Sequence, residues 1–450
     1  MWKRVLALLL TVSVGGYVFA DAWDLLPGPL TTAPAPAEPL PYPTVAQVKA
    51  QAPDVGGEPA AKAPRASEVS SLIEALANHE RNTGQTSVVV SDPRTGEVIA
   101  SLNPDRPAIP ASNMKIVTSA AALEVLGPET TLPTVASLAG TTLYLVGGGD
   151  ILLAEGAGDP HATQGRAGLG DLATAAAQAM KDKGVGAINV VVDSSLFEGP
   201  QYFTGIEGAD RGFIMELRPL AIDRGRASKG GYLPNPDLAA GEVFAEHLRA
   251  AGLEVSGVER GGRAPAAAVE LARVNSAPVR ELVGLLLTAS DNSLAEVMGH
   301  LVGAAKATGS FEGAAKAIGE VMGAKFDMTG VVFGDASGLS MTNRLTASLL
   351  NNILLETWQC KECPLAALPA GLPVASLTGT LTHRFDGSDI SGQVRAKTGT
   401  LVEAISLSGF MRTEAGYPLV FSVLLDHLEE GTAPDSRSLI DGFVEGLAHL

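Results

Sequence analysis

Two kinds of hydrophobic periodicity alternate along the chain, and together they predict a protein with both helices and strands. Apolar residues recur every third or fourth position over residues 66–82, which is the spacing of an amphipathic helix. Apolar and polar residues then alternate over residues 86–103, on both sides of the turn sequence Asp-Pro-Arg-Thr-Gly, so we expect a β-hairpin there. The alanine-rich apolar sequence of residues 110–127 predicts a second helix directly after the hairpin.

The rest of the pattern separates a middle part from a C-terminal part. Between residues 131 and 275, strand-like and helix-like segments alternate and are separated by glycine-rich loops, which predicts a small α/β region. From residue 276 the pattern is helical to about Trp358, and strands then precede a final helix that begins at about Ser436. Because strands lie near both ends of this sequence, we expect the two ends to build one sheet jointly, with the middle part as an insertion.

The N-terminal segment, residues 1–22, has the pattern of a secretory signal. Lys3 and Arg4 precede an uncharged apolar run, and Ala20 and Ala22 follow at the Ala-x-Ala spacing of a cleavage site. The uncharged run is 16 residues long, shorter than the ~20 residues that a membrane-spanning helix needs. We therefore expect a cleaved signal peptide, with an uncleaved anchor as the alternative, and a protein that works outside the cytoplasm in the periplasm or cell wall.

Residues 23–66 are rich in proline and alanine and predict an extended linker. The whole chain is 46% hydrophobic and only 18% charged, which is typical of a globular protein. We expect its main domain to comprise residues 67–130 and 276–450, interrupted by one or more inserted domains at 131–275.

Charge and cysteine content exclude several classes of function. The formal net charge is -17, which argues against a nucleic acid partner because binding to a phosphate backbone needs clustered basic residues. Cys360 and Cys363 are the only cysteines, and in a secreted protein a local disulfide is favoured over a redox motif. Two cysteines alone do not make a zinc site, so we expect neither a metal nor a cofactor.

A serine and a lysine three residues apart, Ser112 and Lys115, are the first candidates for catalysis. On a helix this spacing places the two side chains on the same face, with Cβ atoms about 5–6 Å apart. A serine hydroxyl is a poor nucleophile until a nearby base takes its proton. The apolar neighbours of Lys115 disfavour the charged ammonium, so we expect a lowered pKa that lets the amine act as this base. The alternative is a capping serine beside a solvated lysine.

Ser290 and Asn292, in the sequence Ser-Asp-Asn, add a hydroxyl and an amide from a distant part of the chain. Catalysis by Ser112 needs a path for a proton to the leaving amine, and Ser290 with a second amine can supply it. Asn292 can form a hydrogen bond with Lys115 and with a substrate amide. The alternative is that Ser290 or Asp291 caps the helix that follows, and both roles can hold together.

Lys397, Thr398, Gly399 and Thr400 lie in a strand pattern, so both threonines share one face of the strand. Hydroxyl groups beside the cationic Lys397 suit a substrate that ends in a carboxylate, and Gly399 would let the ligand approach the backbone closely. The N–H groups of Thr400 and Ser112 are the candidate oxyanion donors. The alternative is that the threonines only favour the strand.

These three motifs and their order resemble the class C low-molecular-mass penicillin-binding proteins, the D-alanyl-D-alanine carboxypeptidase/endopeptidases. The segments LYLVGGGD, VVVDSSLF, GDASGLSMTNRLT and VRAKTGTLVEAISLSGF are also similar to that family, and the likeness covers roughly residues 70–445. The resemblance implies an α+β fold, a penicillin-binding transpeptidase/β-lactamase-like domain in which helices cover an antiparallel sheet, with an inserted small α/β region.

The same resemblance implies a serine peptidase that acts on peptidoglycan stem peptides through an acyl-enzyme on Ser112 and that β-lactam antibiotics inhibit. Lys115, Ser290, Asn292 and Lys397 would complete the catalytic set. A β-lactamase is one alternative, although the chain has no Glu-x-x-Leu-Asn segment to activate a deacylating water. A non-catalytic penicillin-binding or wall-binding protein on the same fold is the other.

Overall fold

The computed structural model describes residues 2–22 and 62–450, which belong to two separate compact units. The first unit contains the helix α1 (Trp2–Ala22), which coincides with the predicted signal peptide or anchor. No helix among the described residues combines the length and the apolar character that a membrane span requires. Most of the predicted linker, residues 23–66, lies outside the described residues.

The second unit is built on a five-stranded antiparallel sheet to which both ends of the sequence contribute. Its strands, in the order in which they pair, are β10 (Val394–Thr400), β11 (Ala404–Arg412), β12 (Pro418–Asp426), β1 (Gln85–Ser91) and β2 (Val98–Leu102). The early hairpin β1–β2 joins the late strands through β12, in a register that places Val88 opposite Val423. The predicted joint sheet is therefore confirmed.

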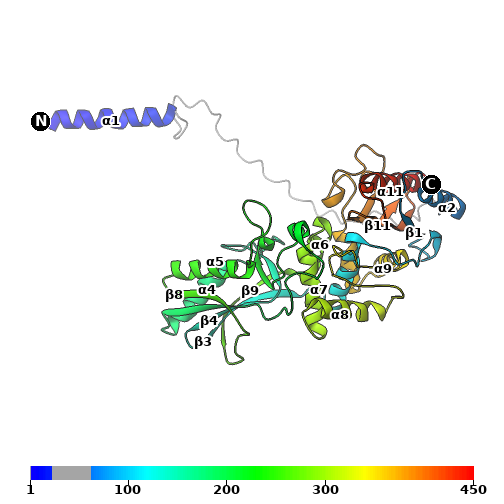
Figure 1. Cartoon of the computed structure of the whole chain (residues 1–450). Coiled ribbons are helices and arrows are strands. Elements are labelled where there is room, and N and C mark those ends of the chain that lie inside the picture. The colour runs from blue at the N-terminus through cyan, green and yellow to red at the C-terminus, as the bar shows by residue number, and fades with distance from the viewer. Residues whose placement is uncertain (1, 23–61) are drawn as a thin grey trace. The chain divides into compact units, whose positions relative to one another are not determined.

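Helices cover both faces of this sheet, so its central strands are apolar on both sides. The helices α2 (Ala66–Ala77) and α11 (Ala433–Ala448) cover one face, and α9 (Ala347–Gln359) covers the other (Figure 1). Val88 and Val90 pack with α2 and α11, whereas Val89 between them packs with α9 in a second core. This alternation is the period of two that a strand imposes.

The second core surrounds a helix that is buried along most of its length. The helix α3 (Met114–Leu126) buries every residue from Met114 to Leu123 and contacts α6 (Val279–Ala289), α7 (Asn292–Lys306) and α8 (Phe311–Gly323). A helix that is buried on every side is typical of the centre of a domain. This packing fixes the first residues of α3 relative to α7. Cys360 and Cys363, directly after α9, form the expected local disulfide.

The prediction that the chain is helical from residue 276 to Trp358 is wrong for residues 324–346, which form an irregular loop between α8 and α9. The buried carboxylate of Asp335 organises this loop, because it accepts hydrogen bonds from the N–H groups of Gly338 and Ser340, both at 2.7 Å, and from the Asn343 amide at 2.8 Å. Short polar side chains that bond to nearby backbone in this way compete with a helix.

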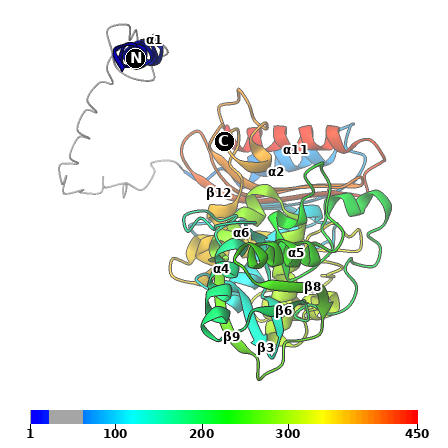
Figure 2. The ribbon, with the colours of Figure 1, turned by 90° about the vertical axis from the view of Figure 1, so that its left-hand side faces the viewer.

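The insertion has its own mixed sheet and its own core. Its strands pair in the order β8 (Glu254–Gly261), β6 (Ala187–Asp193), β4 (Thr142–Gly147), β3 (Thr131–Ala139) and β9 (Val269–Pro278). The pairs β8–β6 and β6–β4 are parallel, and the other two are antiparallel. The helices α4 (Leu169–Asp182) and α5 (Pro236–Ala250) pack together against this sheet (Figure 2). A short parallel pair, β5 (Asp150–Leu153) and β7 (Leu220–Ile222), completes the region.

We expect the core of the insertion to depend strongly on Phe244, which is fully buried on α5. Phe244→Ala should lower the free energy of unfolding of this region by about 3–5 kcal/mol, the usual cost of such a truncation. Val269→Ala is the matched control, because Val269 is 53% exposed on the same sheet, and it should cost less than about 0.5 kcal/mol. Chemical denaturation, combined with hydrogen exchange of peptides from β4 and β6, measures the change in free energy of unfolding for both variants. Equal effects of the two variants would contradict the assignment of this core.

Candidate active site

The three sequence motifs meet where α3, α7 and β10 come together. Ser112 lies on a single 3-10 turn (Ala111–Asn113) that leads into α3, and this turn contacts β10. Ser290 and Asn292 lie at the junction of α6 and α7. Two cavities of about 490 and 460 Å³ open beside Ser112, and both are lined by Ser112 and Thr400. The nucleophile candidate therefore faces space large enough for a peptide ligand.

The turn that carries Ser112 is strained and tightly held. Ala111 has a φ of +46°, a left-handed conformation that costs a residue with a side chain roughly 1–2 kcal/mol. Ser406 on β11 donates a hydrogen bond to the Pro110 carbonyl at 2.7 Å and accepts one from the Asn113 amide. Contacts with β11 thus hold the strained backbone in place, as is common at functional sites.

Lys115 is completely buried, and its Nζ has three acceptors. It lies 3.0 Å from Ser112 Oγ, 2.7 Å from Asn292 Oδ1 and 2.6 Å from the Ser337 carbonyl oxygen. Burial lowers the pKa of Lys115 to about 8, and the negative charges of nearby acidic residues limit this decrease. These residues are Asp335, Asp291 and Glu296. The amine can therefore be neutral near physiological pH.

This geometry directs the lone pair of a neutral Lys115 amine toward Ser112. A neutral amine donates two hydrogen bonds, and the Asn292 and Ser337 oxygens can only accept. The third direction, toward Ser112 Oγ, then carries the lone pair. Lys115 is consequently positioned to take the proton of the Ser112 hydroxyl.

The insertion fixes the orientation of the Asn292 amide. Asn292 Nδ2 donates a hydrogen bond at 3.0 Å to the carbonyl of Phe213, which belongs to the insertion. This leaves Oδ1 directed at Lys115. Arg224, also from the insertion, forms an ion pair with Asp291 at 3.4 Å. The insertion thus contributes directly to the site, although all three motifs lie outside it.

Glu296 on α7 contacts the loop that carries Ser337, and this role was not predicted from the sequence. Its buried carboxylate accepts hydrogen bonds from the N–H groups of Ala336 and Ser337, the latter at 2.8 Å. These bonds hold the Ser337 carbonyl against Lys115. Burial and the neighbouring Asp335 raise the pKa of Glu296 to about 8, against the effect of the hydrogen bonds. The only signal in the sequence was an acidic residue on an otherwise apolar helix.

Ser290 and Lys397 form a second pair of hydroxyl and amine. Lys397 is fully buried, and its Nζ lies 2.8 Å from Ser290 Oγ and 2.7 Å from the Thr398 carbonyl. Burial, with the nearby charge of Lys115, holds the pKa of Lys397 well below its usual range. Asp291 caps α7 by accepting from the Leu294 N–H, so the capping alternative applies to Asp291 and leaves Ser290 free to face the cavity.

The second half of β10 presents an open edge to the cavity. The Leu401 N–H donates to Ala404 across the hairpin, and the Ala396 N–H donates outward to the Pro373 carbonyl. By the period of two, the N–H groups of Thr398 and Thr400 also point outward, beyond the reach of Pro373. Thr400 N–H can therefore serve as an oxyanion donor together with the Ser112 N–H.

Gly399 has a different role from the one predicted. A Cβ atom built on Gly399 would lie 2.1 Å from Ser406 Oγ and 3.0 Å from the Pro110 carbonyl oxygen. The glycine therefore lets β10 pack against the turn that carries Ser112, and it does not face the ligand. Thr398 and Thr400, on the opposite face of the strand, do line the cavity.

The remaining walls of the cavities come from residues that the sequence analysis missed. Thr380, whose hydroxyl lies 2.7 Å from that of Thr398, and Arg437 on α11 line the larger cavity. Asp210 and Phe213 from the insertion line the other cavity. These residues lie in segments without any motif. Within the described ranges, 2–22 and 62–450, no cluster of three or more His, Cys, Asp or Glu side chains could hold a metal ion.

Comparison with known proteins agrees with this site. The D-Ala-D-Ala carboxypeptidase 3 (S13) family matches residues 69–230 and 231–447. A carboxypeptidase of Mycobacterium tuberculosis is 32% identical over 92% of this chain and 89% of its own length. A D-alanyl-D-alanine carboxypeptidase of an Actinomadura strain is 29% identical over 84% of this chain and 85% of its own length.

Solved structures establish the fold. Penicillin-binding protein 4 from Haemophilus influenzae aligns with a TM-score of 0.69 at 18% identity, over 85% of this chain and 99% of that one. The predicted penicillin-binding-type α+β fold is thereby confirmed. The family match likewise favours the predicted peptidase over the β-lactamase and the non-catalytic alternatives. The chain belongs to the D-Ala-D-Ala carboxypeptidase 3 (S13) family and is a serine-type D-Ala-D-Ala carboxypeptidase.

Proposed function

We propose that the protein removes the terminal D-alanine from peptidoglycan stem peptides through an acyl-enzyme on Ser112, and that β-lactams acylate the same serine. The observation that carries this proposal is the contact of 3.0 Å between the buried Lys115 amine and Ser112 Oγ, with the other two positions on that amine held by Asn292 and Ser337. A protein of similar fold from Bdellovibrio bacteriovorus is named a predatory endopeptidase, and cleavage of a cross-bridge would use the same acylation step.

The acylation step follows from these positions. Ser112 Oγ attacks the carbonyl of the penultimate D-alanine while its proton passes to Lys115 Nζ. The resulting oxyanion lies between the N–H groups of Ser112 and Thr400, each such donor typically contributing ~2.7–4 kcal/mol in the transition state. When the C–N bond breaks, Ser290, supported by Lys397, gives its proton to the departing amine of D-alanine, and the proton that Lys115 took from Ser112 replaces it, so that Ser290 is again a hydroxyl and Lys115 a neutral amine. Water then hydrolyses the ester and restores Ser112.

The open edge of β10 suggests how the substrate is held. An extended peptide can add to this edge through the free N–H groups at Thr398 and Thr400. The terminal carboxylate of the substrate would lie near the hydroxyls of these two threonines, where Arg437 contributes positive charge. The cationic end of the larger cavity therefore matches a substrate that ends in a carboxylate.

The N-terminal pattern supports an extracytoplasmic location. Peptidoglycan lies outside the cytoplasmic membrane, and residues 1–22 carry the basic, apolar and small-residue regions of a secretory signal. We therefore include secretion in the proposal, with cleavage after the small residues favoured over retention as an anchor. Mass analysis of the N-terminus of the protein isolated from its cells distinguishes the two.

We expect a labelled penicillin to attach covalently to Ser112 and the purified protein to release D-alanine from muropeptides. Ser112→Ala should abolish both activities because, among the described residues, the Lys115 amine contacts no other hydroxyl group. Ser119→Ala is the matched control, since Ser119 is a buried serine on the same helix that does not line either cavity. Gel fluorescence and product mass analysis provide the two measurements. Covalent labelling of a folded Ser112→Ala protein would refute the assignment.

The pH dependence should report the buried Lys115 amine. Because only the neutral amine accepts a proton, kcat/KM should rise with pH and level off above about 8, the pKa of Lys115. Lys115→Arg keeps a positive charge but cannot deprotonate, so acylation should fall by roughly 10²–10⁴-fold at every pH. Stopped-flow acylation over pH 6–10 tests this, and a Lys115→Arg protein that acylates at nearly the native rate would exclude Lys115 as the base.

Glu296 should act as a positioning residue for Lys115. Glu296→Ala leaves the N–H groups of Ala336 and Ser337 without their acceptor, so the Ser337 carbonyl should shift, and kcat should fall by roughly 10–10²-fold with little change in KM. Glu296→Gln retains one acceptor oxygen and should restore part of this loss. Steady-state kinetics separates the two constants. Equal kcat values for the alanine and glutamine variants would indicate that the carboxylate does not position the loop.

A further inference from the structure

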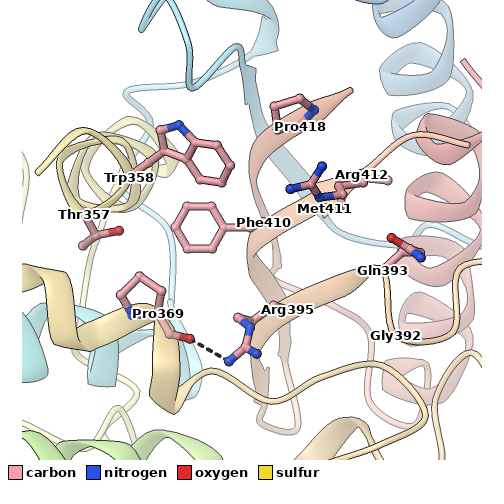
Figure 3. A pocket seen from close by; sticks show the side chains of 10 residues that line it. All are labelled: Thr357, Trp358, Pro369, Gly392, Gln393, Arg395, Phe410, Met411, Arg412 and Pro418. Atoms are coloured by element: carbon pink, nitrogen blue, oxygen red, sulfur yellow. Dashed lines mark hydrogen bonds between the residues drawn. The ribbon is translucent and has the colours of Figure 1, made fainter. Parts of the chain in front are cut away.

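A further cavity, of about 380 Å³, lies at the beginning of β10, at the opposite end of this strand from Thr400 (Figure 3). Five of its lining residues share one face of the sheet, because they are cross-strand partners or lie two positions apart. These five residues are Gln393, Arg395, Phe410, Arg412 and Pro418. Trp358, near the end of α9, and Pro369 close the other side. We call this cavity the Trp358 groove.

An aromatic surface forms one wall of the groove. The rings of Trp358 and Phe410 lie 5.9 Å apart between centroids and are inclined by 32°, and Phe410 is almost fully buried beneath. Trp358 remains 39% exposed, although a tryptophan is among the most favourable residues to bury or to use for binding. The exposed indole therefore offers an apolar contact surface next to the sheet.

Two guanidinium groups flank this aromatic wall and lack acidic partners. Arg395 donates to the carbonyls of Pro369 and Ala370 at 3.0 and 3.2 Å, and Arg412 donates to the Gly416 carbonyl at 3.5 Å. Neither arginine takes part in any of the ion pairs formed within residues 62–450. Glu414, in the adjacent turn, is paired with His449. In a chain with a net charge of -17, two such cations at one groove favour an anionic ligand.

We propose that the Trp358 groove binds a carboxylate of a second stem peptide in the peptidoglycan polymer, apart from the peptide that is cleaved. The small apolar side chains of such a peptide would contact Trp358, and its carboxylate would contact Arg412 and the unoccupied donors of Arg395. Thr400 lies five positions after Arg395 on the strand, about 17 Å at the usual rise, a span that one polymeric substrate can bridge. This inference rests on the proposed function, because it assumes peptidoglycan as the substrate.

If the proposal is correct, changes in the groove should affect turnover of the polymer but not turnover of a small substrate. Arg412→Gln and Trp358→Ala should leave kcat/KM for a soluble D-Ala-D-Ala peptide within about twofold, whereas KM for uncross-linked peptidoglycan should rise about tenfold. Sedimentation of the protein with insoluble peptidoglycan should weaken in parallel. Arg249→Gln is the matched control, because Arg249 is an exposed arginine on α5 far from this sheet, and it should alter neither measurement.

Two further polymers identify the ligand. One polymer is glycan stripped of its peptides, and the other is peptidoglycan whose carboxylates are amidated. Each should bind the native protein weakly, with the affinity that intact polymer has for the Arg412→Gln protein. Full binding of either would overturn the proposal, and so would unchanged polymer KM in both variants. Trp358 packs on Phe410, so Trp358→Ala could unfold the protein. In that case Arg412→Gln alone still tests the proposal. Failure of the native enzyme on the small peptide would instead contradict the proposed function itself.

Discussion

Burial of one lysine is the constraint on which the catalytic domain depends. The Lys115 ammonium is excluded from water, so each of its hydrogen-bonding positions must be supplied by the protein, since an uncompensated buried charge is very costly. The three acceptors come from the turn at Ser112, from the start of α7 and from the loop at Ser337, which follows Lys115 by 222 residues. The same burial lowers the pKa of the amine, so the contacts that join these three segments also prepare the base.

Close backbone packing around the nucleophile is what makes this arrangement rigid. Gly338 and Gly399 have no side chain, and a Cβ at either position would collide with the turn that carries Ser112, lying 1.9 Å from the Ala111 carbonyl oxygen in the case of Gly338. The loop and β10 therefore enclose the turn from two sides and hold Ala111 in its strained conformation. A pre-organised nucleophile needs little rearrangement when the substrate arrives.

The insertion acts as part of this site, although it has a separate core. The Phe213 carbonyl fixes the amide of Asn292, and Arg224 neutralises Asp291 at the start of α7. Asp210 and Phe213 also line one of the two cavities beside Ser112. Changes in the insertion can therefore alter both the orientation of the catalytic groups and the shape of the substrate site. The Trp358 groove lies on the same sheet that presents Lys397 and Thr400, at the other end of β10.

The sequence by itself determined the elements whose signals are local. Ser112 and Lys115 could be paired because their spacing on one helix fixes their distance, and the joint sheet followed from alternating strands at both ends. The order of the three motifs then indicated the family, and with it the roles of Ser290, Asn292 and Lys397. Each of these features depends on residues that are neighbours in the chain or on a pattern with a fixed period.

Only the tertiary structure decided the contacts between distant segments. The irregular loop at 324–346 lies between two helices, and its form depends on the hydrogen bonds that its backbone and Asn343 make to one buried carboxylate, Asp335. The roles of Glu296 and Gly399 likewise exist only because α7 meets this loop and β10 meets the turn at Ser112. No local period carries such information, because the energy of these contacts comes from close packing and desolvation between parts that the chain brings together only on folding.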